Sequence, residues 1–142
     1  MSMIDGVVLG SSQNPMYVRP GSGTASGTFT TTLLPAGATA FTAVSAADIT
    51  GTSSTAVKAA GASGVVHYIT AITVSNLAAA VATRVDILDG ATVIWSGPAA
   101  AAGGGFCITF GIPKAGTAAT AINAQCGTTA AQVRVAIAGY SI

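Results

Sequence analysis

The chain has 142 residues, which is enough for one domain with its own hydrophobic core. Charged residues make up only 6% of it and the net charge is +1, whereas about 25% of the residues in an average soluble protein are charged. So little charge argues against a basic surface that binds nucleic acid or an anionic membrane. We interpret it as a sign that other protein covers much of the surface; an alanine- and threonine-rich surface that tolerates water is the alternative.

Residues 1–53 alternate short apolar runs with turn residues. Residues 4–9 and 28–34 are typical of short strands, and the Gly/Ser-rich stretch 20–27 between them is typical of a flexible linker. We therefore predict an N-terminal arm that adds to the sheet edge of a partner. The alternative is that residues 4–9 form an edge strand of the chain's own sandwich. The side chains expected to contact the partner are Ile4, Val7, Val8, Leu9, Met16, Tyr17 and Arg19.

Residues 54–142 form the second predicted part, in which strand-like runs recur with turn signals between them. Two alanine runs, at 78–82 and 99–102, are too short for stable helices. The pattern predicts an all-β fold, a jelly-roll-like antiparallel β-sandwich that carries the N-terminal arm. Together with a short strand at 41–44, the predicted strands are 55–60, 65–76, 83–88, 92–97, 106–112, 120–126 and 132–142.

One hairpin is predicted in detail, because Asp89 and Gly90 lie between two alternating runs. A two-residue loop at Asp89 and Gly90 would mix polar and apolar side chains on one face of the hairpin. A three-residue loop, with Gly90 in a left-handed conformation, keeps the apolar side chains together. The expected pairs are Ile87 with Ala91, Val85 with Val93, and Thr83 with Trp95.

Alternation along the predicted strands also selects a hydrophobic core. On the last strand, for example, Val133, Val135 and Ile137 point one way while Arg134 and Ala136 point the other. Most of the core side chains are small, so contacts with partners are expected to add to the stability of the sandwich. The predicted core residues are Ile72, Val74, Val85, Ile87, Val93, Trp95, Phe106, Ile108, Phe110, Ile122, Val133, Val135 and Ile137.

The histidine and the cysteines do not form the pattern of a reactive site. His67 is the only histidine of the chain, and a metal site needs several converging ligands. We interpret it as a structural side chain with its hydrogen bonds satisfied. Cys107 and Cys126 lie on different predicted strands, without the spacing of a redox motif, and are expected to be buried thiols.

The acidic residues do not predict catalysis either. Asp86 and Asp89 are close in sequence, but Asp89 has a role in the turn and Asp86 has Arg84 nearby. We expect Arg84, Asp86 and Arg134 to form a small ion-pair cluster on the solvated surface; the alternative is that the cluster fixes register at an interface. No catalytic, metal or cofactor residues are predicted, and the chain is not expected to be an enzyme.

From residue 55 onward the sequence resembles small structural proteins of tailed bacteriophages. The shared pattern starts with V-K-A at 57–59, followed by a long strand and the D-G hairpin at 89–90. It continues with G-G-x-F at 103–106, T-A-x-x-A at 117–121 and a final V-x-V-x-x-x-G-Y at 133–140. The resemblance implies a virion component without catalytic residues. Residues 1–53 lie outside it.

This resemblance implies a capsid decoration, or cement, protein that binds the outer surface of the phage head and stabilises it. The expected partners are the major capsid protein and further copies of the chain, in a trimer rather than a dimer, with no nucleic acid and no membrane. The expected location is the capsid surface of the virion, after assembly in the host cytoplasm. The alternative is a phage tail or fibre component or a glycan-binding β-sandwich module, for which Trp95, Tyr17, Tyr68 and Tyr140 are the candidate sugar contacts.

Overall fold

The computed structural model describes residues 34–142, which contain eight β-strands and no helix. The predicted all-β class is confirmed, and each strand predicted after residue 40 has an observed counterpart. The predicted strand at 28–34 and the arm residues lie outside the described residues, apart from Leu34. The strands are β1 (Thr39–Val44), β2 (Thr55–Lys58), β3 (His67–Asn76), β4 (Thr83–Asp89), β5 (Thr92–Ala99), β6 (Gly105–Ala115), β7 (Ile122–Cys126) and β8 (Val133–Ser141).

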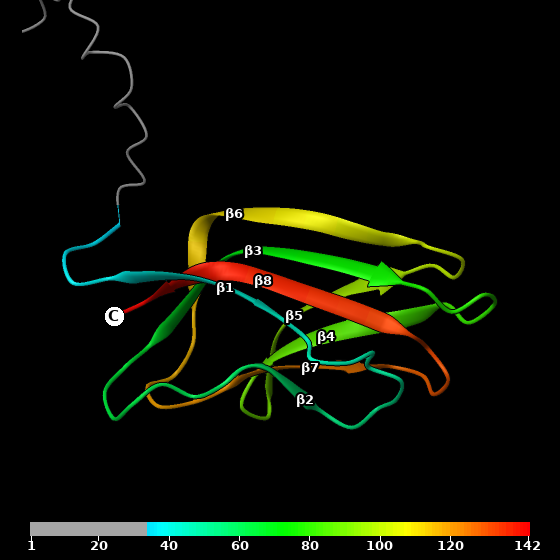
Figure 1. The fold of residues 1–142 in the computed structure, drawn as a ribbon, viewed down its shortest axis with the longest axis horizontal. Helices are drawn as coiled ribbons and strands as arrows, with labels where there is room; N and C mark the ends of the chain where they lie inside the picture. Colours follow the sequence, from blue (N-terminus) through cyan, green and yellow to red (C-terminus); the bar gives the residue numbers. More distant parts are fainter. Residues whose placement is uncertain (1–33) are drawn as a thin grey trace, which may run out of the picture. The chain divides into compact units, whose positions relative to one another are not determined.

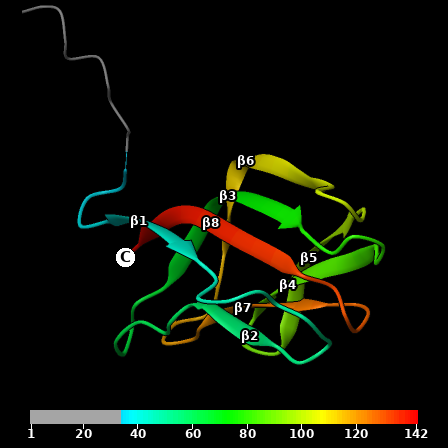
Figure 2. The same ribbon diagram turned by 45° about the vertical axis from the view of Figure 1, so that its right-hand side comes forward.

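The strands form two four-stranded sheets that face each other as the layers of a sandwich (Figures 1 and 2). One sheet has the order β1-β8-β3-β6 and the other β2-β7-β4-β5, and all neighbouring strands are antiparallel. Every connection except the β4–β5 hairpin crosses from one sheet to the other. This order is that of an eight-stranded jelly roll, so the predicted jelly-roll-like sandwich is confirmed.

Alternating branched side chains fill the space between the sheets. Eight of the predicted core residues are buried there, including Ile72, Val85 and Ile137. The predicted burial of Val93 is wrong, since this side chain is 48% exposed on the edge strand β5. Trp95, Phe106, Ile108 and Phe110 are only partly buried and pack against the core from β5 and β6. They remain partly exposed because each of these strands has a neighbour on one side only among the described residues.

The β4–β5 hairpin has a different register from the predicted one. Ile87 pairs with Trp95 rather than with Ala91, and the loop between the strands has two residues. The register shifts next to Ile87 because β5 contains an extra residue, Ile94. This bulge lets Trp95 pack toward the core beside Ile87, while Val93 stays exposed. Gly90 has a φ of 61°, so its predicted left-handed conformation is confirmed.

The sandwich begins upstream of residue 54. Strand β1 pairs with β8 along its whole length, and Ile49 forms a further bridge with Val133. Phe41 packs against the core from β1. Residues 39–49, which the sequence pattern assigned to the N-terminal part, therefore belong to the sandwich, because their pairing partners lie almost 100 residues further along the chain.

Candidate interaction surface

The outer face of the sheet β1-β8-β3-β6 consists of small, uncharged side chains. The register places these side chains in rows that run across the four strands. We call this surface the uncharged face. Its rows are Val44, Ala136, Thr73 and Cys107; Thr42, Ala138, Ala71 and Thr109; and Ala40, Tyr140, Tyr68 and Ala115.

Strand alternation explains this composition. In β8, Val135 and Ile137 point into the core, so Ala136 and Ala138 point outward. The bulge at Thr70 keeps β3 in step with β8, and its hydroxyl donates to the carbonyl oxygen of Ala138 at 3.1 Å. The nearest charges on β8 belong to the ion pair of Arg134 with Asp48, one row beyond the uncharged face.

Two tyrosines are the aromatic side chains of the uncharged face. The rings of Tyr68 and Tyr140 lie on neighbouring strands with centroids 5.0 Å apart and planes 11° apart. Each ring therefore covers one face of the other, and both side chains are partly buried. This arrangement stiffens the pairing of β3 with β8 but leaves little open ring surface for a ligand.

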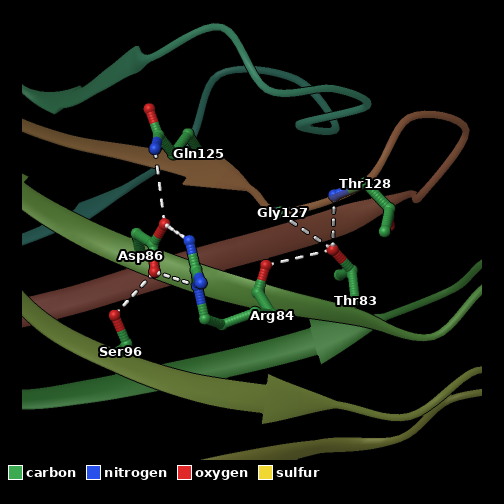
Figure 3. Close-up of polar contacts among 7 residues, drawn as sticks. All are labelled: Thr83, Arg84, Asp86, Ser96, Gln125, Gly127 and Thr128. Atoms are coloured by element: carbon green, nitrogen blue, oxygen red, sulfur yellow. Dashed lines mark hydrogen bonds and ion pairs between the residues drawn. The ribbon is translucent and has the colours of Figure 1, made fainter.

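The outer face of the other sheet is built around a buried carboxylate (Figure 3). Asp86 on β4 is 1% exposed and accepts two hydrogen bonds from Arg84, at 2.6 and 2.7 Å. Ser96 on β5 donates to it at 2.6 Å, and Gln125 on β7 donates at 3.3 Å. Asp86 thus joins three neighbouring strands. We call the surface formed by these four side chains the polar face.

The environment of Asp86 keeps it ionised. Burial acts to raise the pKa of its carboxyl group, but the hydrogen bonds from Arg84, Ser96 and Gln125, together with the charge of Arg84, outweigh it and lower the pKa. The same hydrogen bond and charge raise the pKa of Arg84, whose side chain is 63% exposed. The arrangement is therefore a charge-assisted tie between strands.

The predicted surface cluster of Arg84, Asp86 and Arg134 is wrong in two respects. Asp86 is buried rather than exposed. Arg134 lies on β8 in the other sheet, where it pairs with Asp48. The sequence pattern did not show which sheet each strand would join, and that choice separates the two arginines.

His67 has the structural role expected from its sequence. It is buried, its Nε2 lies 2.9 Å from the carbonyl oxygen of Ala59, and its Nδ1 lies 2.8 Å from the hydroxyl of Ser141. Because a carbonyl oxygen only accepts, Nε2 carries a hydrogen and donates it to Ala59. The ring ties β3 to β8 and to the segment after β2.

The two cysteines differ in exposure. Cys126 is buried, and its thiol donates to the carbonyl oxygen of Ile49 at 3.2 Å. Burial raises the pKa of this thiol. Cys107, in contrast, is exposed, so its predicted burial is wrong. It alternates with Phe106 and Ile108, which point toward the core, and therefore points outward from β6.

Among residues 34–142, no three His, Cys, Asp or Glu side chains lie close enough together to hold a metal ion. The same stretch has no helix with the length and apolar character needed to span a membrane. The predicted arm contacts, Ile4 to Leu9 with Met16, Tyr17 and Arg19, lie outside the described residues. Comparison with protein-family models and with curated proteins finds no match for this chain.

The uncharged face was not among the features predicted from the sequence. The residues that could have indicated it are the small ones that alternate with the core residues of the last strand, Ala136 and Ala138, and the threonines of β1 and β3. Joining them into one surface requires the strand order, which brings β1, β8 and β3 side by side although the chain visits them far apart.

Proposed function

We propose that this chain is a virion structural protein, a capsid decoration protein that binds the outer surface of a phage head through protein–protein contacts. The observation that carries the proposal is the contrast between the two outer faces of the sandwich. In the polar face, Arg84, Ser96 and Gln125 already donate hydrogen bonds to Asp86, so these groups are paired within the chain. The side chains of the uncharged face carry no charge and are mostly small, so a protein surface can cover this face without desolvating a charge.

The size of the uncharged face explains why such a protein would act in several copies. Four strands about 4.8 Å apart, over about five residues of about 3.3 Å each, make a face of roughly 300 Å². A stable protein–protein contact buries about 800 Å² on each partner. One copy is therefore expected to bind weakly, and linked copies firmly, through multivalency.

A glycan-binding module is less well supported by the aromatic side chains. Sugar sites use open ring faces, whereas Tyr68 and Tyr140 stack on each other. Trp95 lies against Phe106, with ring centroids 4.8 Å apart, at the side where β5 approaches β6. Tyr17 lies outside the described residues.

The proposal is tested by thiol labelling on heads. A Thr73→Cys variant made in a Cys107→Ser background carries one exposed thiol on the uncharged face, because Cys126 is buried. Binding to heads that lack this chain should protect the thiol from an alkylating reagent. The matched control, Thr92→Cys in the same background, carries its thiol on β5 and should stay reactive.

Two results would contradict the proposal. If the chain binds heads while the thiol at position 73 stays reactive, another surface makes the contact. If it does not bind heads and purified virions contain only a few copies, the chain belongs to the tail or to another site. A decoration protein should instead be present in hundreds of copies, which quantitative mass spectrometry of virions measures.

A further inference from the structure

The four outer edges of the two sheets differ in how they are protected. Edge strands expose unpaired backbone groups, and proteins commonly block them with lysine, proline, bulges or short length. Strand β2 has four residues, a register shift and Lys58, and β5 has Pro98 and a bulge. Both edges of the sheet β2-β7-β4-β5 are therefore blocked.

The other sheet lacks these features along the whole of β1 and along the regular part of β6. Strand β1 has six residues with no charge, proline or register shift. Strand β6 pairs regularly with β3 from Gly105 to Thr109, and its proline and lysine come only after the register break that follows. Each edge also carries an exposed large hydrophobic side chain, Val44 on β1, which is 54% exposed, and Ile112 on β6, which is 85% exposed.

Hydrogen bonds next to the strands show which backbone groups face these edges. The amide of Ser45 donates to Val135 on β8, so alternation turns the amides of Thr42 and Val44 away from β8. The amide of Asn76 on β3 donates to Gly104, so the amides of Cys107 and Thr109 point away from β3. Among residues 34–142, no strand pairs with either of these edges.

The two edges match each other in length, direction and chemistry. In the antiparallel order β1-β8-β3-β6, β6 runs opposite to β1. If the sheet continued into a second copy, β6 of the first copy and β1 of the second would be antiparallel neighbours. Their regular segments have five and six residues, and neither brings a charge into the contact.

We propose that copies of this chain associate head to tail, with the β6 edge of one copy paired with the β1 edge of the next. This contact uses both unprotected edges, whereas a twofold contact between two β6 strands would leave β1 unpaired. A head-to-tail contact closes into a ring when its rotation permits, which suits a trimer. Each copy in the ring is held at two edges, and the uncharged face continues from copy to copy.

This inference rests on the proposed function for its need of several linked copies, but its test is separate. Thr42→Pro and Thr109→Pro each remove one amide that faces an edge and leave the hydrogen bonds to β8 and β3 in place. Light scattering should give a wild-type mass that is a multiple of the 13.6 kDa monomer. Each proline variant alone should have the monomer mass. An equimolar mixture should form a dimer, because one intact β6 edge meets one intact β1 edge.

Thr42→Ala and Thr109→Ala are the matched controls, since they keep the amide and should keep the wild-type mass. If a proline variant loses its β-sheet signal in circular dichroism, hydrogen exchange of the wild type decides instead. The amides of Thr42 and Thr109 should exchange slowly in the oligomer and rapidly after dilution to the monomer.

Several results would overturn the inference. In light scattering, these are a wild type that stays monomeric and alanine controls that dissociate. In hydrogen exchange, it is edge amides that exchange equally fast in the oligomer and the monomer. A further such result is dissociation by Thr109→Pro but not by Thr42→Pro. The last result would mean that another segment, such as residues 28–33 of a neighbour, occupies the β6 edge. Head binding by monomeric proline variants would leave the proposed function standing. Rings that do not bind heads would contradict that function alone.

Discussion

At the scale of single residues, Asp86 is the side chain on which the polar face depends. Its carboxylate is buried, yet Arg84, Ser96 and Gln125 donate to its two oxygens. A buried carboxylate without such donors would be costly, whereas this one ties β4 to both of its neighbours. Arg84 stays largely in solvent and covers the carboxylate from outside.

We predict that Asp86→Asn lowers the free energy of unfolding by about 1–3 kcal/mol at neutral pH, because it removes charge-assisted hydrogen bonds. Since the pKa of Asp86 is lowered in the fold, its contribution is present above the ordinary value of 3.8 and is lost as the pH falls below that value. Urea unfolding should therefore show the difference between wild type and variant shrinking with acidification.

Asp48→Asn is the matched control for this prediction. It removes the carboxylate of a solvent-accessible ion pair with Arg134 and should change stability by about 1 kcal/mol or less. An Asp86→Asn variant as stable as wild type at neutral pH would show that the buried carboxylate contributes nothing to the sheet.

At the scale of elements, the approach of β5 to β6 depends on one aromatic contact. Trp95 on β5 lies against Phe106 on β6, and Gly97 leaves room for the indole ring. A Cβ atom at Gly97 would come within 2.2 Å of the tryptophan ring. The glycine is therefore required for this position of the ring, which covers the core between the two edge strands.

We predict that Trp95→Ala lowers the free energy of unfolding by about 3 kcal/mol, at the lower end of aromatic truncations because the ring is only partly buried. Gly97→Ala should also destabilise the fold and shift the fluorescence of Trp95, the only tryptophan of the chain. Thermal unfolding measures the stability of both variants, and emission spectra of Gly97→Ala measure the shift in fluorescence. If Trp95→Ala kept the wild-type melting temperature but lost binding to a partner or a glycan, Trp95 would be a surface anchor.

At the scale of the whole molecule, the described residues 34–142 contain all eight strands of the sandwich and both of its sheets. Deleting residues 1–20 should therefore leave the melting temperature nearly unchanged. It should weaken binding to heads if Ile4, Val7, Tyr17 and their neighbours contact the capsid as predicted. Calorimetry and co-sedimentation with heads measure the two effects. A truncated chain that unfolds or precipitates would show that this segment is part of the core.

Local pattern in the sequence determined much of this protein. The alternation of Val133, Val135 and Ile137 identified the buried side of the last strand, and Asp89-Gly90 placed the hairpin. Both signals come from the period of a β-strand and from turn chemistry, which depend only on neighbouring residues. They sufficed for the all-β class and for most of the core.

Tertiary structure alone decided the register of β4 with β5, the burial of Asp86, the exposure of Cys107 and the place of β1 in the sandwich. Each depends on which strands become neighbours and which become edges. The uncharged face has the same origin, since it joins Thr42, Ala138 and Thr73 from three separate strands. Strand order is set by the packing of the whole core, and residues close in sequence do not encode it.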